Sequence, residues 1–344
     1  MTLEEFLQEW NNDSERVLVH TSGSTGKPKL LWVEKRRMEA SARITCDFLG
    51  LQEGDTSLLC MSLDYIAGKM MVVRSLVRNL RLMVVEPSGH PLASLSKEDI
   101  DFAAMVPMQV YNSLQIPEER ERLKQIKHLI IGGGAIDEAL ASELKDFPNN
   151  VWSTYGMTET LSHIALRRLN GVEASEWYVP LPNVTVSMNE EGCLVIDAPE
   201  VCTKRLVTND IVEFGRLGDW SFSRLGDLER EVCFRIIGRK DNVIISGGIK
   251  IQIEEVERIL KPFIREPFLI TKRKDEKFGE VVVLLTESTD LENVKKVCQL
   301  HLPQYWKPRD YVFVEKLPMT ETGKPARKKA EEFFILRDRN PGLP

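Results

Sequence analysis

The sequence predicts an α/β protein: a large N-terminal domain of helix-covered sheets with a small antiparallel, barrel-like part, then a small α+β C-terminal domain. Three observations predict this class. Short apolar segments alternate with helical patterns from residue 56 to 147. Short alternating strands with turns follow from residue 183. A charged and glycine-rich segment, residues 239–248, then precedes a second mixed pattern of strands and helices.

The first elements enclose an unusual loop. Residues 17–20 (VLVH) and 30–33 (LLWV) predict two short strands, so residues 21–29 are expected to be the loop between them. Apolar residues at helical spacing then predict a helix that ends at Gly50, a residue that readily takes the left-handed conformation of a helix C-cap.

The middle of the chain supplies the helix-covered sheet. Its segments are continuously apolar and short, as in strands buried on both faces. Strands are expected at 57–63, 81–86, 102–106, 128–133 and from 151, and helices at 67–78 and 136–146.

The later segments predict the barrel-like part and the C-terminal domain. Strands are expected at 184–188, 193–197, 205–214 and 232–238, and a helix is expected at 251–260. Two strands at 268–273 and 281–287, a helix at 290–300 and a strand at 311–315 follow. We place an N-terminal domain at 1–238, a hinge at 239–241 and a C-terminal domain at 242–344. The length of 344 residues also favours two domains.

Composition excludes several classes of protein. A formal net charge of −6 argues against a general nucleic-acid binder, which needs a basic face. The six cysteines form no C-x-x-C pair and no zinc-like cluster with histidine, so we expect reduced thiols. The N-terminus lacks a secretory signal pattern, and no apolar run is long enough to span a bilayer. We therefore expect a cytoplasmic protein with no membrane span.

The strongest motif is the loop at 21–29, which holds four hydroxyls, two glycines and two lysines. Glycines let successive N–H groups turn toward an anion, and the hydroxyls and lysines add donors and charge. The pattern is not a Walker A loop, because Thr21 stands where its first glycine belongs and Pro28 follows the lysine. A flexible surface linker would not explain its place between two apolar strands. The predicted triphosphate ligands are Thr21, Ser22, Gly23, Ser24, Thr25, Gly26 and Lys27.

This loop, TSGSTGKPK, resembles the signature loop of the adenylate-forming superfamily, which includes acyl-CoA synthetases, peptide-synthetase adenylation domains and luciferases. The resemblance covers about residues 15–335, and within the superfamily the chain looks most like the o-succinylbenzoate–CoA ligases of menaquinone biosynthesis. It implies an acid–thiol ligase that uses ATP, Mg²⁺ and coenzyme A. Members of the family usually have a substantial N-terminal portion before this loop, so the chain resembles a compact version of them. A homodimer remains one alternative for its oligomeric state.

Four further segments match the family in order. In YGMTET, Tyr155 would stack on adenine beside Gly156, Thr158 would bind a phosphate and Glu159 would hold Mg²⁺. The loop IGGGA would place Gly133 and Gly134 against the adenine; alone it could be a plain turn. Near TND, Asp210 would bind the ribose, with Asp227 as a rival. In GRKDN, Arg239 would contact ribose or phosphate and Asp241 would be the hinge. In PMTETGKPAR, Lys324 matches the catalytic lysine, although alone it could be a solvated tail charge.

The resemblance also implies a mechanism. A carboxylate attacks the α-phosphate of ATP, pyrophosphate leaves, and Lys324 bridges carboxylate and phosphate. The mobile C-terminal domain then turns about Asp241 and admits the thiol of coenzyme A, which displaces AMP.

The acid is indicated less directly. Tyr65, Gly68 and Lys69 fall where acyl-CoA ligases line the acyl pocket, and a cation there would suit a second carboxylate on the substrate. The alternative is that Lys69 is a solvated helix residue. Other functions left open are transfer of the acyl group to a carrier protein and a non-catalytic nucleotide-binding relic. A kinase is not expected, because the Walker A pattern fails and the sequence motifs of protein kinases are missing.

Overall fold

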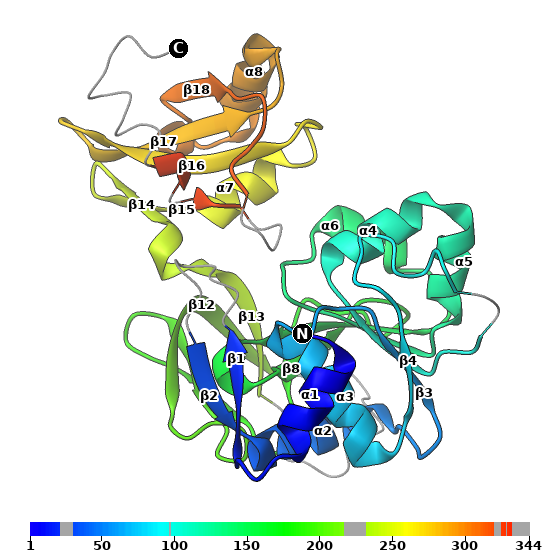
Figure 1. Ribbon diagram of the computed structural model, residues 1–344. Helices are drawn as coiled ribbons and strands as arrows, with labels where there is room; N and C mark the ends of the chain where they lie inside the picture. Colours follow the sequence, from blue (N-terminus) through cyan, green and yellow to red (C-terminus); the bar gives the residue numbers. More distant parts are fainter. Residues whose placement is uncertain (21–29, 96–97, 217–231, 320–324, 328, 332–344) are drawn as a thin grey trace. The chain divides into compact units, whose positions relative to one another are not determined.

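The computed structural model describes residues 1–20, 30–95, 98–216, 232–319, 325–327 and 329–331. The chain divides into two compact units. The first comprises Met1–Ser187, Val195–Val207 and Phe214–Arg235, and the second comprises Met188–Leu194, Thr208–Glu213 and Ile236–Pro344. Figure 1 shows the elements of each unit.

A mainly parallel sheet forms the centre of the first unit. Among the described residues its order is β4-β3-β5-β6-β7-β8-β9. Strands β4 to β7 are parallel, and β8 and β9 run antiparallel at one edge. The strands are β3 (Thr56–Leu59), β4 (Arg81–Val84), β5 (Phe102–Met105), β6 (His128–Ile131), β7 (Asn150–Gly156), β8 (His163–Arg168) and β9 (Val179–Pro180).

Helices cover both faces of this sheet, because successive side chains of a strand point to opposite faces. Leu58 of β3 belongs to a buried cluster with residues of three helices on one face. The neighbouring Ser57 hydrogen-bonds Ser75 of a helix on the other face (2.7 Å between the two Oγ atoms). The first face is covered by α4 (Pro107–Gln115), α5 (Pro117–Gln125) and α6 (Glu138–Leu144), and the second by α2 (Lys35–Leu49) and α3 (Ile66–Arg78).

The N-terminal elements form a small separate layer. Helix α1 (Leu3–Asn11) precedes a two-stranded antiparallel ribbon of β1 (Arg16–His20) and β2 (Leu30–Glu34), in which Leu18 lies opposite Trp32. Residues 21–29, which join these strands, lie outside the described residues. The predicted C-cap of α2 is confirmed: Gly50 has a φ of 67°, and its N–H bonds the carbonyl of Asp47.

A four-stranded sheet follows in the order β10-β11-β12-β13. Its strands are β10 (Thr185–Met188), β11 (Cys193–Asp197), β12 (Leu206–Arg216) and β13 (Val232–Arg239). It corresponds to the predicted barrel-like part.

The C-terminal part is an α+β layer. The order of its strands is β15-β14-β17-β16, with β18 parallel to β17, and an apolar cluster lies between the sheet and two helices. The elements are β14 (Val243–Ser246), β15 (Ile249–Gln252), α7 (Ile253–Leu260), β16 (Phe268–Asp275), β17 (Gly279–Thr286), α8 (Leu291–His301), η3 (Gln304–Trp306) and β18 (Asp310–Phe313).

One predicted boundary is corrected. Helix α7 begins at Ile253, because residues 249–252 pair with β14 in a hairpin whose turn contains Gly247 and Gly248 at positive φ. None of the helices that the structure describes is both long enough and apolar enough to cross a bilayer.

Candidate functional site

Several predicted site residues follow neighbouring strands of the large sheet, at the ends where ligands commonly bind in open α/β sheets. Gly133 and Gly134 come directly after β6, and Tyr155 and Gly156 end β7, which pairs with β6. The two strands approach closely there: a Cβ on Gly132 would lie 2.3 Å from Thr154 Oγ1. The structure therefore brings these two predicted segments together.

The YGMTET segment folds into a tight return from β7 to β8. The 3₁₀ helix η1 (Thr158–Thr160) makes this turn. The buried hydroxyl of Thr160 accepts a hydrogen bond from Met157 N–H (2.9 Å) and lies 2.6 Å from the carbonyl oxygen of Ser162. Gly156 allows the return, since a Cβ there would lie 2.2 Å from that same oxygen. Because Thr160 secures the turn, the half-buried Thr158 and the exposed Glu159 remain accessible to a ligand.

Glu159 fits the metal role predicted for it. Among the described residues, no group of three or more His, Cys, Asp or Glu side chains could hold a metal by itself. Mg²⁺ beside phosphates needs only one or two protein carboxylates, because phosphate and water oxygens complete its shell. An exposed carboxylate on η1 is sufficient for that arrangement.

The ring of Tyr155 lies in an aromatic cluster. Its centroid is 5.4 Å from the ring of Phe234 in an edge-on contact and 5.9 Å from the ring of Tyr178. Tyr178 also hydrogen-bonds Ser153 (2.8 Å from its OH to Oγ). These contacts fix the plane of a half-buried ring, which could stack on a base.

The predicted ribose and hinge residues form one hydrogen-bonded group in the second unit. Arg239 donates to Asp210 Oδ1 (2.9 Å from Nη1) and to Asp241 Oδ2 (3.0 Å from Nη2). Asn209, which stands where the family motif has glycine, donates to both carboxylate oxygens of Asp241 (3.0 and 3.2 Å). Asp241 lies within the 3₁₀ helix η2 (Lys240–Asn242).

Three predicted positions cannot be located. The loop Thr21–Lys27, the rival ribose residue Asp227 and the catalytic Lys324 all lie outside the described residues.

Helix α3 changes the interpretation of the acyl-pocket residues. Lys69 is 1% exposed, so the alternative that it is solvated is wrong. Its ammonium donates to the carbonyl of Leu18 (2.7 Å) and lies 3.4 Å from Glu9 Oε2, so it has two partners within the protein. Gly68 allows close packing, since a Cβ there would lie 2.3 Å from the carbonyl oxygen of Ser62. Tyr65, at the N-cap of α3, is 37% exposed.

Sequence reasoning missed Arg74, which lies five residues after Lys69 on α3. It is 2% exposed, and Nη2 donates to Ser162 Oγ (2.6 Å), while Nη1 has only the weak acceptor Met71 Sδ at 3.8 Å. Its Nε has no partner, and no described residue forms an ion pair with it. Burial lowers the pKa of Arg74 to about 10, so the group stays charged near neutral pH. An arginine inside the apolar run MMVVRSLV is the signal that could have found it.

The neighbour of Ser162 is a buried, uncharged histidine. His163 Nε2 lies 3.1 Å from Thr45 Oγ1, and its Nδ1 lies 3.3 Å from Ser162 Oγ. Since the Thr45 hydroxyl donates to the carbonyl of Ser41, it accepts from His163 Nε2–H. Burial, with the nearby charge of Arg74, lowers the pKa of His163 well below 6.5. Arg74 is therefore the charged member of this group near neutral pH.

Comparison with known proteins identifies the family of the chain. The model of the AMP-binding enzyme family matches residues 4–200, more than half of the chain. A 2-succinylbenzoate–CoA ligase from Listeria monocytogenes is 25% identical over 339 residues, which cover 95% of this chain and 72% of that protein. A 2-succinylbenzoate–CoA ligase from a Geobacillus species is also 25% identical, over 96% of this chain and 71% of that protein.

Solved structures share the fold. An acyl-CoA synthetase (AMP-forming)/AMP-acid ligase II-like protein from Dyadobacter fermentans is 34% identical, with a TM-score of 0.62, and the match covers 96% of this chain and 93% of that one. The o-succinylbenzoate coenzyme A synthetase of Bacillus subtilis, solved with ATP and magnesium, is 21% identical, with a TM-score of 0.73 and coverage of 91% and 69%. The chain therefore belongs to the AMP-binding enzyme family, and it is an adenylate-forming ligase.

Proposed function

We propose that this ligase joins an acid with two carboxylates to coenzyme A through an acyl adenylate, and that the acid is o-succinylbenzoate. The observation that carries the proposal is Arg74, a buried guanidinium for which the described residues supply no carboxylate. The relatives named 2-succinylbenzoate–CoA ligase, at 25% identity over most of the chain, support the same acid.

A buried and unpaired cation is costly, because the desolvation of an ion costs several kcal/mol and no opposite charge offsets it. A carboxylate brought by the substrate would offset that cost, and the planar guanidinium fork suits a carboxylate well. Arg74 donates to Ser162, two residues after the YGMTET segment ends. It therefore lies beside the segment that we assign to the nucleotide. We assign the second carboxylate to Arg74 rather than to Lys69, whose ammonium already has partners.

We assign the nucleotide to the residues expected from the sequence. The triphosphate is bound by Thr21–Lys27 and Thr158, the adenine by Gly133, Gly134 and Tyr155, and the ribose by Asp210 with Arg239. Mg²⁺, held by Glu159, would neutralise phosphate charge. These assignments are supported by the accessible Thr158 and Glu159 on η1 and by the ion pair of Asp210 with Arg239.

The reaction has two steps. A substrate carboxylate oxygen attacks the α-phosphorus of ATP, the bond to the bridging oxygen breaks, and pyrophosphate leaves. Lys324 supplies positive charge to this step, where negative charge builds on phosphorus. The thiolate of coenzyme A then attacks the acyl carbon, and AMP leaves. We propose that residues 242–344 turn about 239–241 between the two steps, with Asp241 as the pivot.

A panel of acids tests the function. Pyrophosphate release should be fastest with o-succinylbenzoate and at least about tenfold slower with 4-oxo-4-phenylbutanoate, which lacks only the ring carboxylate, since a charge-assisted hydrogen bond contributes about 1.5–3 kcal/mol. Release of AMP should then require coenzyme A. Equal rates with both acids would contradict the role of Arg74. AMP release that needs a carrier protein in place of coenzyme A would contradict the thiol acceptor.

A further inference from the structure

The open edge of strand β1 is held by side chains from two helices. Within the described residues β2 is the only strand that pairs with β1, and the other edge of β1 has only an isolated bridge from His20 to Tyr65. At that edge Leu18 N–H donates to Glu9 Oε1 of α1 (3.2 Å), and the Leu18 carbonyl accepts from Lys69 Nζ of α3 (2.7 Å). The two side chains supply the acceptor and the donor that a third strand would supply.

Glu9 and Lys69 also pair with each other. Lys69 Nζ lies 3.4 Å from Glu9 Oε2 and 5.4 Å from the centroid of the Phe6 ring. The side chain of Lys69 is 2% exposed and that of Glu9 is 22% exposed. Loss of either partner would leave the other charge poorly paired in a desolvated place, which is strongly unfavourable. The Glu9 carboxylate, the Lys69 ammonium and the Leu18 peptide groups therefore form one hydrogen-bonded cluster in which each member contacts the other two.

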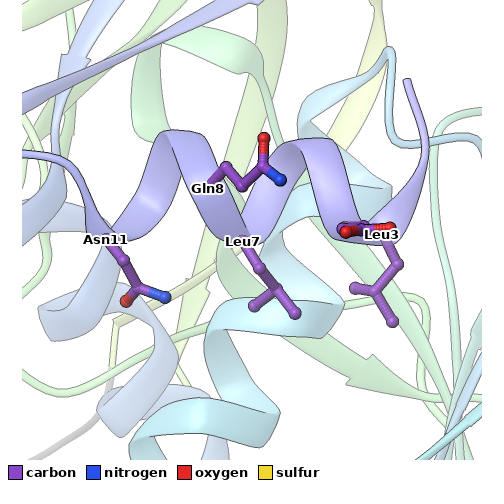
Figure 2. A pocket seen from close by; sticks show the side chains of 5 residues that line it. Leu3, Leu7, Gln8 and Asn11 are labelled. Carbon is purple, nitrogen blue, oxygen red and sulfur yellow. The ribbon is translucent and has the colours of Figure 1, made fainter.

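Helix α1 presents this carboxylate from a fixed position. A capping box between Thr2 and Glu5 begins the helix, and Phe6, on its inner face, is fully buried. Figure 2 shows the side chains of Leu3 and Leu7 on one side of the helix, where they line an open hollow of about 570 Å³. That hollow contains none of the predicted nucleotide ligands: its residues are Leu3, Glu4, Leu7, Gln8 and Asn11.

Strand β1, whose edge Glu9 and Lys69 hold, directly precedes the predicted phosphate-binding segment in the sequence. Strand β1 ends at His20, whose backbone forms a parallel bridge with Tyr65 at the start of α3. The next residue is Thr21. We propose that Glu9 and Lys69 are positioning residues for ATP, because they fix the direction in which β1 delivers the chain to residue 21. This inference rests on the proposed function in one respect, namely that the segment starting at Thr21 binds phosphate.

A role in stability alone would also explain a buried ion pair, so the test must separate stability from affinity. The variants are Lys69→Met, Lys69→Arg and Glu9→Gln, and the matched control is Lys35→Met. Lys35 Nζ bonds the carbonyl and the side chain of Asn12 (2.8 and 3.0 Å), so it holds the end of α1 and does not touch β1. The measurement is the dissociation constant of Mg·ATP by calorimetry, without any acid, well below the melting temperature of each variant.

We expect Lys69→Met to weaken Mg·ATP binding about tenfold, the scale of one charge-assisted hydrogen bond. Glu9→Gln, which keeps the acceptor for Leu18 N–H, should weaken it by about threefold. Lys69→Arg should recover most of the affinity, because its guanidinium can reach both partners. Lys35→Met should lower the melting temperature and leave affinity within about twofold of the wild type.

The inference is overturned if Lys69→Met loses stability but binds Mg·ATP as the wild type does. It is overturned together with its premise if the wild-type protein does not bind Mg·ATP. If the affinities follow the expected order but no acid releases pyrophosphate, the proposed function fails and the positioning role stands.

Discussion

Arg74 and Lys69 lie on the same helix, and both carry a charge into the interior. Lys69 has an acidic partner in Glu9, whereas the partners of the Arg74 guanidinium among the described residues are a hydroxyl, a thioether and the ring of Phe102, 6.0 Å away, with no carboxylate. Helix α3 thus carries one cation, Lys69, that has an anionic partner within the protein, and one, Arg74, that has none among the described residues. This difference separates a residue that shapes the protein from one that would bind the substrate.

Arg74→Met tests this assignment. An unpaired buried charge costs desolvation free energy that an apolar side chain does not, so we expect the melting temperature to stay equal or rise. The KM for o-succinylbenzoate should rise about 100-fold, because a charge-assisted hydrogen bond contributes about 1.5–3 kcal/mol. The KM for ATP should stay within about twofold. Steady-state kinetics check both values, and a parallel rise in the two KM values would indicate a structural role.

His163 predicts a pH dependence of stability. Its pKa is lowered in the folded protein by burial and by Arg74, so below pH 6.5 the unfolded chain binds a proton that the folded protein does not. The free energy of unfolding should therefore fall as the pH drops through 6.5, by as much as about 1.4 kcal/mol per pH unit. His163→Gln keeps a donor for Thr45 and removes this contribution. Urea unfolding at pH 7 and 5.5 compares the two, and an equal pH dependence would contradict the prediction.

At the scale of the element, Gly68 is where helix α3 approaches the preceding loop. Its absent Cβ leaves room for the backbone of residues 61–62, and a Cβ would lie 2.3 Å from Ser62 O and 3.0 Å from Met61 O. The glycine expected to line an acyl pocket therefore has a packing reason for its identity. It sets the distance between the loop that follows β3 and the helix that carries Lys69 and Arg74.

Gly68→Ala should therefore destabilise the protein by about 2–4 kcal/mol, although alanine favours a helix by about 1 kcal/mol over glycine. The matched control is Ala67→Gly at the exposed neighbouring position, which should cost about 1 kcal/mol from helix propensity alone. Denaturant unfolding measures both. A Gly68→Ala variant as stable as the wild type would show that the loop moves aside without cost.

At the scale of the whole molecule, the C-terminal part has its own apolar core. Ile244, Ile251, Val256 and Leu284 lie in one buried cluster with residues of α8. Arg327 adds an ion pair to Glu257 with two bonds of 2.7 Å. A part that rotates during catalysis, as proposed for residues 242–344, needs a core that does not depend on the rest of the chain.

We expect residues 242–344, produced alone, to fold. Its buried cluster unites strands and helices that all lie within that range, so their packing should survive isolation. Circular dichroism should show mixed α and β structure, and thermal unfolding should be cooperative. A fragment that is unfolded at all temperatures would contradict the proposed domain boundary.

The sequence by itself determined the order of most strands and helices, the cap at Gly50 and the family motifs, because these depend on local periodicity and on residues close together along the chain. Helices α4 and α5 were missed, although a proline at the first position of each was a usable signal. Only the tertiary structure decided the roles of Lys69, Gly68 and Arg74. Their partners come from distant segments: Leu18 is 51 residues from Lys69, and Ser162 is 88 residues from Arg74. Whether a buried charge is satisfied depends on such contacts, and no local pattern encodes them.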